Sequence, residues 1–309
     1  MSTVTLLGPQ RLSPFIGAEL AKRGISGPVS AITAGWQERE EEDEELRAEV
    51  RVPVYNLRLY ERWDDIRRND QEYFQAHRRR QDKLRQIRRL YQRRLDYLMA
   101  QALDLIAHRG PSELLAPERR HAIQSLQQLD AHYLERVQTV NDEFLWTWKP
   151  TSRTVIARHR DEVVDQIRGS EAVLIAGGHI AVLLNRLRLF DLAPLLKRRP
   201  VFAWSGGAMV LTERIVLFHD TPPQGRGSAE VFETGLGLVP GVVVLPSARH
   251  RLDLTDRQRV RLMAQRLGPA LCVPLDEDEC FSYDSGRIRC KPEVRCLRPD
   301  GGIAPLQES

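Results

Sequence analysis

The chain of 309 residues is long enough for one large domain or two moderate ones, and 42% of its residues are hydrophobic, which argues against global disorder. Its longest apolar run, residues 172–184, is too short to span a bilayer, and the N-terminus lacks a basic region followed by an apolar segment. We therefore expect a cytoplasmic protein without a membrane partner. The 46 basic residues exceed the 42 acidic ones, and whether this excess indicates a nucleic-acid partner depends on where the basic residues lie.

The four cysteines all lie near the C-terminus and form no CxxC pair: Cys272, Cys280, Cys290 and Cys296. The close ligand spacing of a zinc site is therefore missing. We expect reduced thiols, no metal and no other cofactor.

The first 35 residues predict a βαβ unit. A short apolar strand at residues 4–7 precedes a helix at residues 14–23, with Ser13 as N-cap before Pro14, and a second strand follows at residues 29–33. Strand, helix and strand in so short a span favour a parallel pair within an α/β sheet.

The composition then changes from acidic, over residues 38–49, to basic, over residues 62–94. Two segments show helical spacing of apolar residues and are joined by Gly110 and Pro111, which predicts a helical hairpin or coiled-coil-like arm over residues 46–149. The first stripe consists of Leu84, Ile87, Tyr91, Leu98, Ala102 and Leu105; the second consists of Ile123, Leu126, Tyr133, Val137, Val140 and Phe144, with Asp130 at a position that the spacing would make apolar.

The arginine-rich helix is expected to form a solvated or oligomer-forming face, so we predict a homo-oligomer, a dimer, through this arm. Phosphate contacts are the alternative, but the neighbouring acidic segment offsets the charge and no stacking aromatic pattern accompanies it. Nucleic acid is therefore disfavoured as a partner. The excess positive charge is expected to lie away from the chemistry of the protein.

From residue 151 strands and helices alternate again, with strands expected at residues 172–176, 200–203, 215–218, 242–245, 270–273, 280–283 and 287–290. The sequence predicts an α/β domain with a doubly wound, mostly parallel sheet over residues 1–45 and 150–309, interrupted by the helical insertion. No GxxxxGK[ST] motif is present, and residues 225–227 (GRG) are expected to form a loop.

Residues 201–210 (VFAWSGGAMV) carry the strongest chemical signal. An apolar strand runs into Ser205, small residues follow, and a helical segment begins. This is the arrangement of a nucleophile elbow, in which the serine Oγ is exposed on a tight turn and the next amide, here that of Gly206, points at the developing oxyanion. Ala203 replaces the first glycine of the GxSxG pattern. An ordinary glycine turn is the alternative.

Several ordered segments resemble the cyanophycinase and dipeptidase E family of serine peptidases, which has the class I glutamine amidotransferase-like fold. These segments are residues 174–179 (LIAGGH), 204–210 (WSGGAMV), 212–213 (TE), 235–244 (GLGLVPGVVV) and 275–278 (LDED). The resemblance is loose over residues 1–37, extends over residues 151–300, and leaves out the helical arm.

The resemblance implies Ser205 as nucleophile and the amides of Gly178 and Gly206 as oxyanion hole. His179 replaces the asparagine or aspartate that usually follows the glycines, and it could contact substrate. The general base of the family would fall near Pro246 or Ser247, whereas the nearest histidine, His250, comes three residues later. His250 is the first candidate for the base, with a surface histidine as its alternative.

His219 is the reserve candidate for the base. If neither histidine reaches Ser205, the chain is a non-catalytic relative. Asp253, Asp276 and Glu277 could orient the base or bind a basic group, and Glu213 could contact substrate or hold its helix, although each could also be an ordinary surface carboxylate.

The sequence therefore predicts a serine hydrolase of peptide or isopeptide bonds with a peptide-like substrate. The resemblance implies a preference for Asp-containing or basic-branched substrates. The alternative is a catalytically degenerate family member that acts as a binding or scaffold protein through its helical arm.

Overall fold

The computed structural model describes residues 3–220 and 227–308, and its centre is a seven-stranded mixed sheet with the strand order β11-β10-β1-β5-β4-β2-β3. β1 to β5 run parallel, and β10 and β11 add an antiparallel edge. The strands are β1 (Val4–Leu7), β2 (Val29–Ile32), β3 (Val54–Asn56), β4 (Ala172–Ile175), β5 (Val201–Trp204), β10 (Cys280–Asp284) and β11 (Arg287–Cys290). The predicted fold class, a mostly parallel α/β sheet with a helical insertion, is confirmed.

Both faces of this sheet are buried, as a doubly wound sheet requires. Successive residues of β4 alternate between two apolar clusters: Val173 and Ile175 pack in one, whereas Ala172 and Leu174 pack in the other. Because side chains of a strand point alternately to its two faces, the clusters lie on opposite sides of the sheet. This explains why β4 reads as a continuous apolar run in the sequence.

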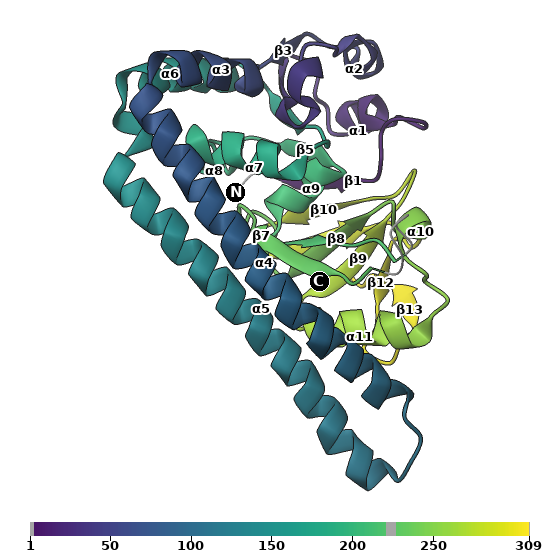
Figure 1. Cartoon of the computed structure of the whole chain (residues 1–309). Helices are drawn as coiled ribbons and strands as arrows, with labels where there is room; N and C mark the ends of the chain where they lie inside the picture. Colours follow the sequence, from purple (N-terminus) through teal and green to yellow (C-terminus); the bar gives the residue numbers. More distant parts are fainter. Residues whose placement is uncertain (1–2, 221–226, 309) are drawn as a thin grey trace.

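Smaller pairs of strands and further helices surround the central sheet (Figure 1). The paired strands are β6 (Arg214–Leu217) with β7 (Glu230–Thr234), β8 (Val242–Pro246) with β9 (Leu271–Leu275), and β12 (Arg295–Leu297) with β13 (Ile303–Pro305). The shorter helices are α1 (Ile16–Lys22), α2 (Glu44–Val50), α3 (Leu59–Asn69), α6 (Thr154–Arg168), α7 (Ile180–Leu189), α8 (Ala193–Leu196), α9 (Gly206–Leu211), α10 (Ala248–Arg251) and α11 (Arg257–Leu267), with 3-10 turns at Ala34–Arg39 and Pro150–Ser152.

The insertion contains two long antiparallel helices, α4 (Gln71–Ala107) and α5 (Ser112–Trp148), which run side by side along the flank of the α/β layers (Figure 1). Their apolar stripes belong to the same core cluster as the sheet, which contains Ile87 of α4, Leu126 of α5 and Val173 of β4. The helical pair is thus packed against the α/β layers over part of its length. The division into domains at residues 45/46 and 149/150 stays a prediction.

Asp130 stands on the apolar face of α5 because it meets a buried arginine. Its carboxylate accepts hydrogen bonds from Nε and Nη2 of Arg266 of α11, both at 2.7 Å, and Tyr91 of α4 donates to the same carboxylate at 2.8 Å. A buried charge is tolerated when it is paired and hydrogen-bonded. The interruption of the apolar pattern therefore marks the place where α4, α5 and α11 are held together.

Among the described residues, the search for membrane-spanning segments found no helix with the length and hydropathy needed to cross a bilayer. The four cysteines carry free thiols, and burial raises the pKa of Cys272 to about 12.

Candidate active site

Ser205 stands on a tight turn between β5 and α9. Its backbone has φ 51° and ψ −125°, a conformation that a residue with a side chain rarely adopts. Such strain persists only where the surrounding structure enforces it, and it is concentrated at functional sites. The elbow predicted from residues 201–210 is therefore present in the backbone.

The glycines after β4 explain how the strained turn is held. A Cβ atom added to Gly177 would lie 2.6 Å from Ser205 Cβ and 3.1 Å from the Gly206 nitrogen, and one added to Gly178 would lie 2.3 Å from the Gly35 carbonyl oxygen. Gly178 itself has φ 109°. Only glycine fits these positions, so the backbone after β4 packs directly on the serine turn, and the Gly178 and Gly206 amides come from adjoining segments.

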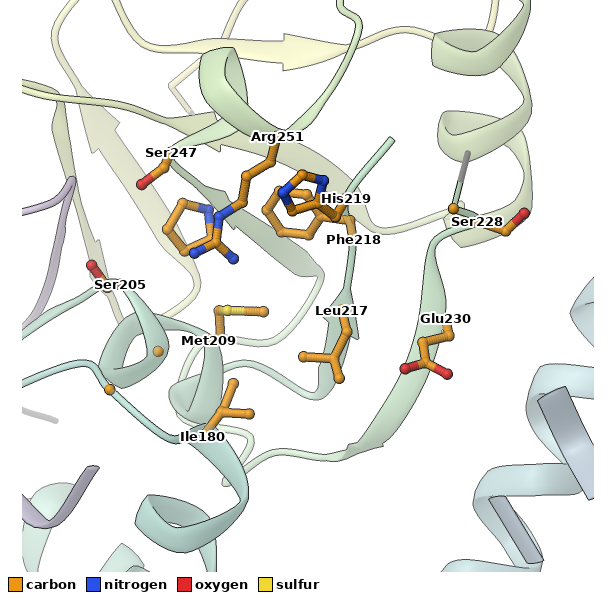
Figure 2. Close-up of a pocket in the computed structure, with 14 residues that line it drawn as sticks. Ile180, Ser205, Met209, Leu217, Phe218, His219, Ser228, Glu230, Ser247 and Arg251 are labelled. Atoms are coloured by element: carbon orange, nitrogen blue, oxygen red, sulfur yellow. The ribbon is translucent and has the colours of Figure 1, made fainter. Parts of the chain in front are cut away.

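A cavity of about 590 Å³ opens beside Ser205 (Figure 2). Its wall combines three glycines with apolar side chains and a few polar or charged ones. The lining residues are Gly178, Ile180, Ser205, Gly206, Met209, Leu217, Phe218, His219, Gly227, Ser228, Glu230, Pro246, Ser247 and Arg251. Of the predicted glycine loop, Gly227 lines the cavity, and Gly225 and Arg226 lie outside the described residues.

The two candidate histidines lie in different places. His219 lines the cavity, and Figure 2 shows it across from Ser205 with the Arg251 side chain between them. The His250 side chain is 73% exposed, its Nε2 lies 3.8 Å from Glu277, and His250 does not line this cavity. Among the described residues, no hydrogen bond joins either histidine to Ser205 Oγ.

Arg251 occupies the cavity instead of His250. The two are consecutive residues of α10, and neighbouring residues of a helix point in directions about 100° apart. Arg251 extends over the Phe218 ring, with 6.0 Å between its Cζ and the ring centroid. Ser247, at the start of α10, also faces the cavity and has a left-handed backbone (φ 54°). Pro246 and Ser247, where the resemblance would place the base, are thus beside the Ser205 cavity.

The candidate carboxylates support loops rather than line the cavity. Asp276 is buried and accepts a hydrogen bond from the Arg249 backbone amide at 3.1 Å; burial raises the pKa of its carboxyl. Glu277 faces His250, Asp253 accepts hydrogen bonds from Thr255, and Glu213 accepts one from the Gly241 amide at 3.0 Å.

His179 is exposed and caps α7: its Nδ1 accepts a hydrogen bond from the Val182 amide at 3.3 Å. It lines neither of the cavities that contain Ser205. The second of these, about 570 Å³ in volume, lies beside Trp204 and Ser205 and is bordered by carboxylates of the acidic segment, including Glu42, Glu44, Glu45 and Glu49.

Glu230 of β7 is a cavity residue that the sequence did not indicate. Its carboxylate accepts hydrogen bonds from Arg88 and Gln92 of α4. The expectation that the basic residues lie away from the chemistry is therefore wrong for Arg88. The sequence pattern did not predict β7, because Glu230 and Glu233 interrupt its apolar residues. The arginines that pair with these two carboxylates, Arg88 and Arg188, come from distant parts of the chain.

Among the described residues, no cluster of three or more histidine, cysteine, aspartate or glutamate side chains is arranged to hold a metal ion.

Comparison with known proteins gives the family of the chain. The model of peptidase family S51 matches residues 122–290, more than half of the 309 residues. The match begins inside α5, so it includes part of the helical pair, which sequence analysis placed outside the resemblance. The search of curated proteins found no match.

Two solved structures are similar to this chain. One is a peptidase from an acI-B1 actinobacterium (12% identity, TM-score 0.47), with 100% of this chain and 93% of that one covered. The other is a protein assigned to peptidase E from Listeria monocytogenes EGD-e (11% identity, TM-score 0.43), with 94% of this chain and 98% of that one covered. With its family model matched over more than half of its length, the chain belongs to peptidase family S51.

Proposed function

We propose that the chain is a serine-type hydrolase of peptide-like substrates, with Ser205 as nucleophile. The observation that carries this proposal is the strained backbone of Ser205 beside a cavity, with Gly177 and Gly178 packed against the turn. Membership of a peptidase family adds the class of substrate.

In the proposed reaction, Ser205 Oγ attacks the carbonyl carbon of the scissile bond, and its proton passes to a general base. The Gly206 and Gly178 amides hold the negative charge that develops on the carbonyl oxygen. The base then gives its proton to the leaving amine, an acyl-serine remains, and water releases the second product.

We propose His219 as the base in preference to His250, because His219 shares the cavity with Ser205 while His250 faces Glu277. A base must come within hydrogen-bond reach of the serine, directly or through one water, and such contacts often tighten only when substrate is bound. Arg251 supplies a fixed positive charge in the same cavity, which favours a substrate carboxylate there.

A fluorophosphonate probe tests the nucleophile. Wild type should be labelled, Ser205→Ala should not, and His219→Ala should be labelled far more slowly, while His250→Ala serves as the matched control and should react like wild type. Equal labelling of wild type and Ser205→Ala would contradict the role of Ser205. Hydrolysis of Asp-containing and basic-branched peptides then tests the substrate class.

A second candidate is a relative that binds peptides without cleaving them. It is favoured by Ser247, which lines the cavity where the family resemblance would place the base. Under this alternative, wild type binds peptides without turnover, and Ser247→His raises hydrolysis by supplying a base. If instead wild type cleaves peptides and His219→Ala abolishes cleavage, the non-catalytic candidate is excluded.

We also propose that two copies of the chain associate through the helical pair, where Leu90 and Tyr97 of α4 are large exposed apolar side chains. Sedimentation equilibrium of wild type and Tyr97→Glu measures this. A monomeric wild type would contradict it.

A further inference from the structure

A third cavity lies between the helical pair and the α/β layers, away from Ser205. Its volume is about 280 Å³, and it shares no lining residue with either cavity that contains Ser205. Side chains of α4, α5 and α7 and the backbone after β7 form its wall. The polar and charged side chains in that wall are Tyr73, His77, Arg80, Gln138, Asn141, Asp142, Asn185, Arg188, Asp191 and Thr234.

Arg80 is the unusual member of this wall. Its Nε is buried and has no hydrogen-bond partner, and in the part of the chain that the structure describes its guanidinium forms no ion pair with a carboxylate. Nη2 donates to Asn185 Oδ1 at 2.8 Å, and the guanidinium lies over the Phe144 ring, with 4.4 Å from Cζ to the ring centroid. Arg80 is therefore positioned by neutral groups, and the carboxylate whose charge acts on it, that of Glu233, is already paired with Arg188.

Neighbouring arginines add further positive charge near Arg80. Arg188 is paired with Glu233, but Arg186, which is 6% exposed, has a buried Nε without a partner and lies over Trp63 at 4.4 Å. Burial, reinforced by the charges of Arg80 and Arg186, lowers the pKa of His77 to about 3.

The carboxylates of the wall have other contacts. Asp142 accepts hydrogen bonds from Gln138 at 3.3 and 3.4 Å, and Asp191 lies 3.7 Å from Arg160. An uncompensated charge held away from water carries a free-energy cost. A bound anion would remove much of that cost at Arg80.

We propose that this cavity binds a small anionic ligand whose phosphate or carboxylate group pairs with Arg80. The planar guanidinium, whose Nε–H has no partner, can pair with two oxygens of either group. The volume is at the lower limit of ordinary ligand cavities, which restricts the ligand to a small molecule. Asn185 beside Arg80 and the aromatic rings of Tyr73 and His77 would form the rest of its surroundings.

Calorimetric titration of the full chain with inorganic phosphate, and separately with malonate, tests the proposal, with sodium chloride at matched ionic strength as reference. Wild type should bind at least one of the two anions. The anion that binds more tightly shows whether the cavity prefers a phosphate or a carboxylate group. Arg80→Met should weaken binding by at least about tenfold, because the charged hydrogen bonds are lost. Arg79→Met, on the exposed face of the same helix, is the matched control and should bind like wild type.

Asn185→Asp provides a variant of the same shape. It places a carboxylate where Arg80 Nη2 now finds an amide oxygen, so Arg80 gains its own counter-ion and anion binding should fall by a similar factor. This variant decides the question if Arg80→Met does not fold. Binding of neither anion by wild type, or undiminished binding by Asn185→Asp, would overturn the proposal. Ser205→Ala should retain anion binding, so the result is independent of the proposed hydrolysis.

Discussion

Asp130 and Arg266 form a bidentate ion pair across the interface between α5 and α11, with both hydrogen bonds at 2.7 Å and both side chains no more than 3% exposed. Arg266 also donates to the Ala229 carbonyl at 2.6 Å, and Tyr91 accepts from the Val231 amide at 3.0 Å. The pair therefore ties the helical insertion to the segment that contains Glu230, a residue of the Ser205 cavity.

We expect Asp130→Asn to lower the free energy of unfolding by about 3–5 kcal/mol, because Arg266 would remain as an uncompensated buried charge. The exposed pair Lys83–Glu143, at 3.5 Å, is the control, and Glu143→Gln should cost less than about 1 kcal/mol. Urea denaturation measures both. A loss below about 1 kcal/mol in Asp130→Asn would show that the pair does not hold the helices.

Ser205→Gly should raise the free energy of unfolding by about 1 kcal/mol while abolishing labelling and hydrolysis, because glycine adopts φ 51° without the strain of a side chain. Ser205→Ala removes the hydroxyl and keeps the Cβ, so it should lose activity without this gain. Thermal and chemical denaturation of the three proteins provide the comparison. A Gly variant less stable than the Ala variant would contradict strain at this turn.

Arg251→Met should weaken the binding of peptides with a carboxylate near the scissile bond by about tenfold or more, since a charge-assisted hydrogen bond is lost inside the cavity. Affinities are measured in a Ser205→Ala background, which prevents turnover. His250→Ala alters the adjacent residue of α10 and should leave the affinity unchanged. If both variants bind alike, Arg251 has no part in substrate recognition.

His77 should make stability depend on pH. Its pKa is about 3 in the folded chain, against 6.5 for the unperturbed group, so between these values the unfolded chain binds more protons. Stability is therefore lost as the pH falls below about 6.5, with a slope approaching about 1.4 kcal/mol per pH unit from this group.

His77→Phe keeps a ring beside Trp63, 4.7 Å away between centroids, and should remove that slope. Urea denaturation between pH 5 and 7, in buffers whose anion is chloride, measures the difference from wild type. His132→Phe, at an exposed position of α5, is the control. Parallel pH profiles of wild type and His77→Phe would contradict the burial of a neutral histidine.

The α/β class, the helical insertion, the serine turn and the strands of the central sheet other than β3 were predictable from the sequence, because each is determined by local patterns. Apolar runs bounded by glycine and proline mark the strands, helical spacing marks α4 and α5, and small residues around Ser205 mark the tight turn. The tertiary structure decided which side chains reach the Ser205 cavity. His250 and Arg251 are adjacent in sequence, yet the rotation of a helix between neighbours places only Arg251 in the wall. Glu230 and Asp130 look out of place in apolar patterns until Arg88 and Arg266 are brought to them by packing. Such pairings depend on contacts between residues more than a hundred positions apart, which local periodicity cannot encode.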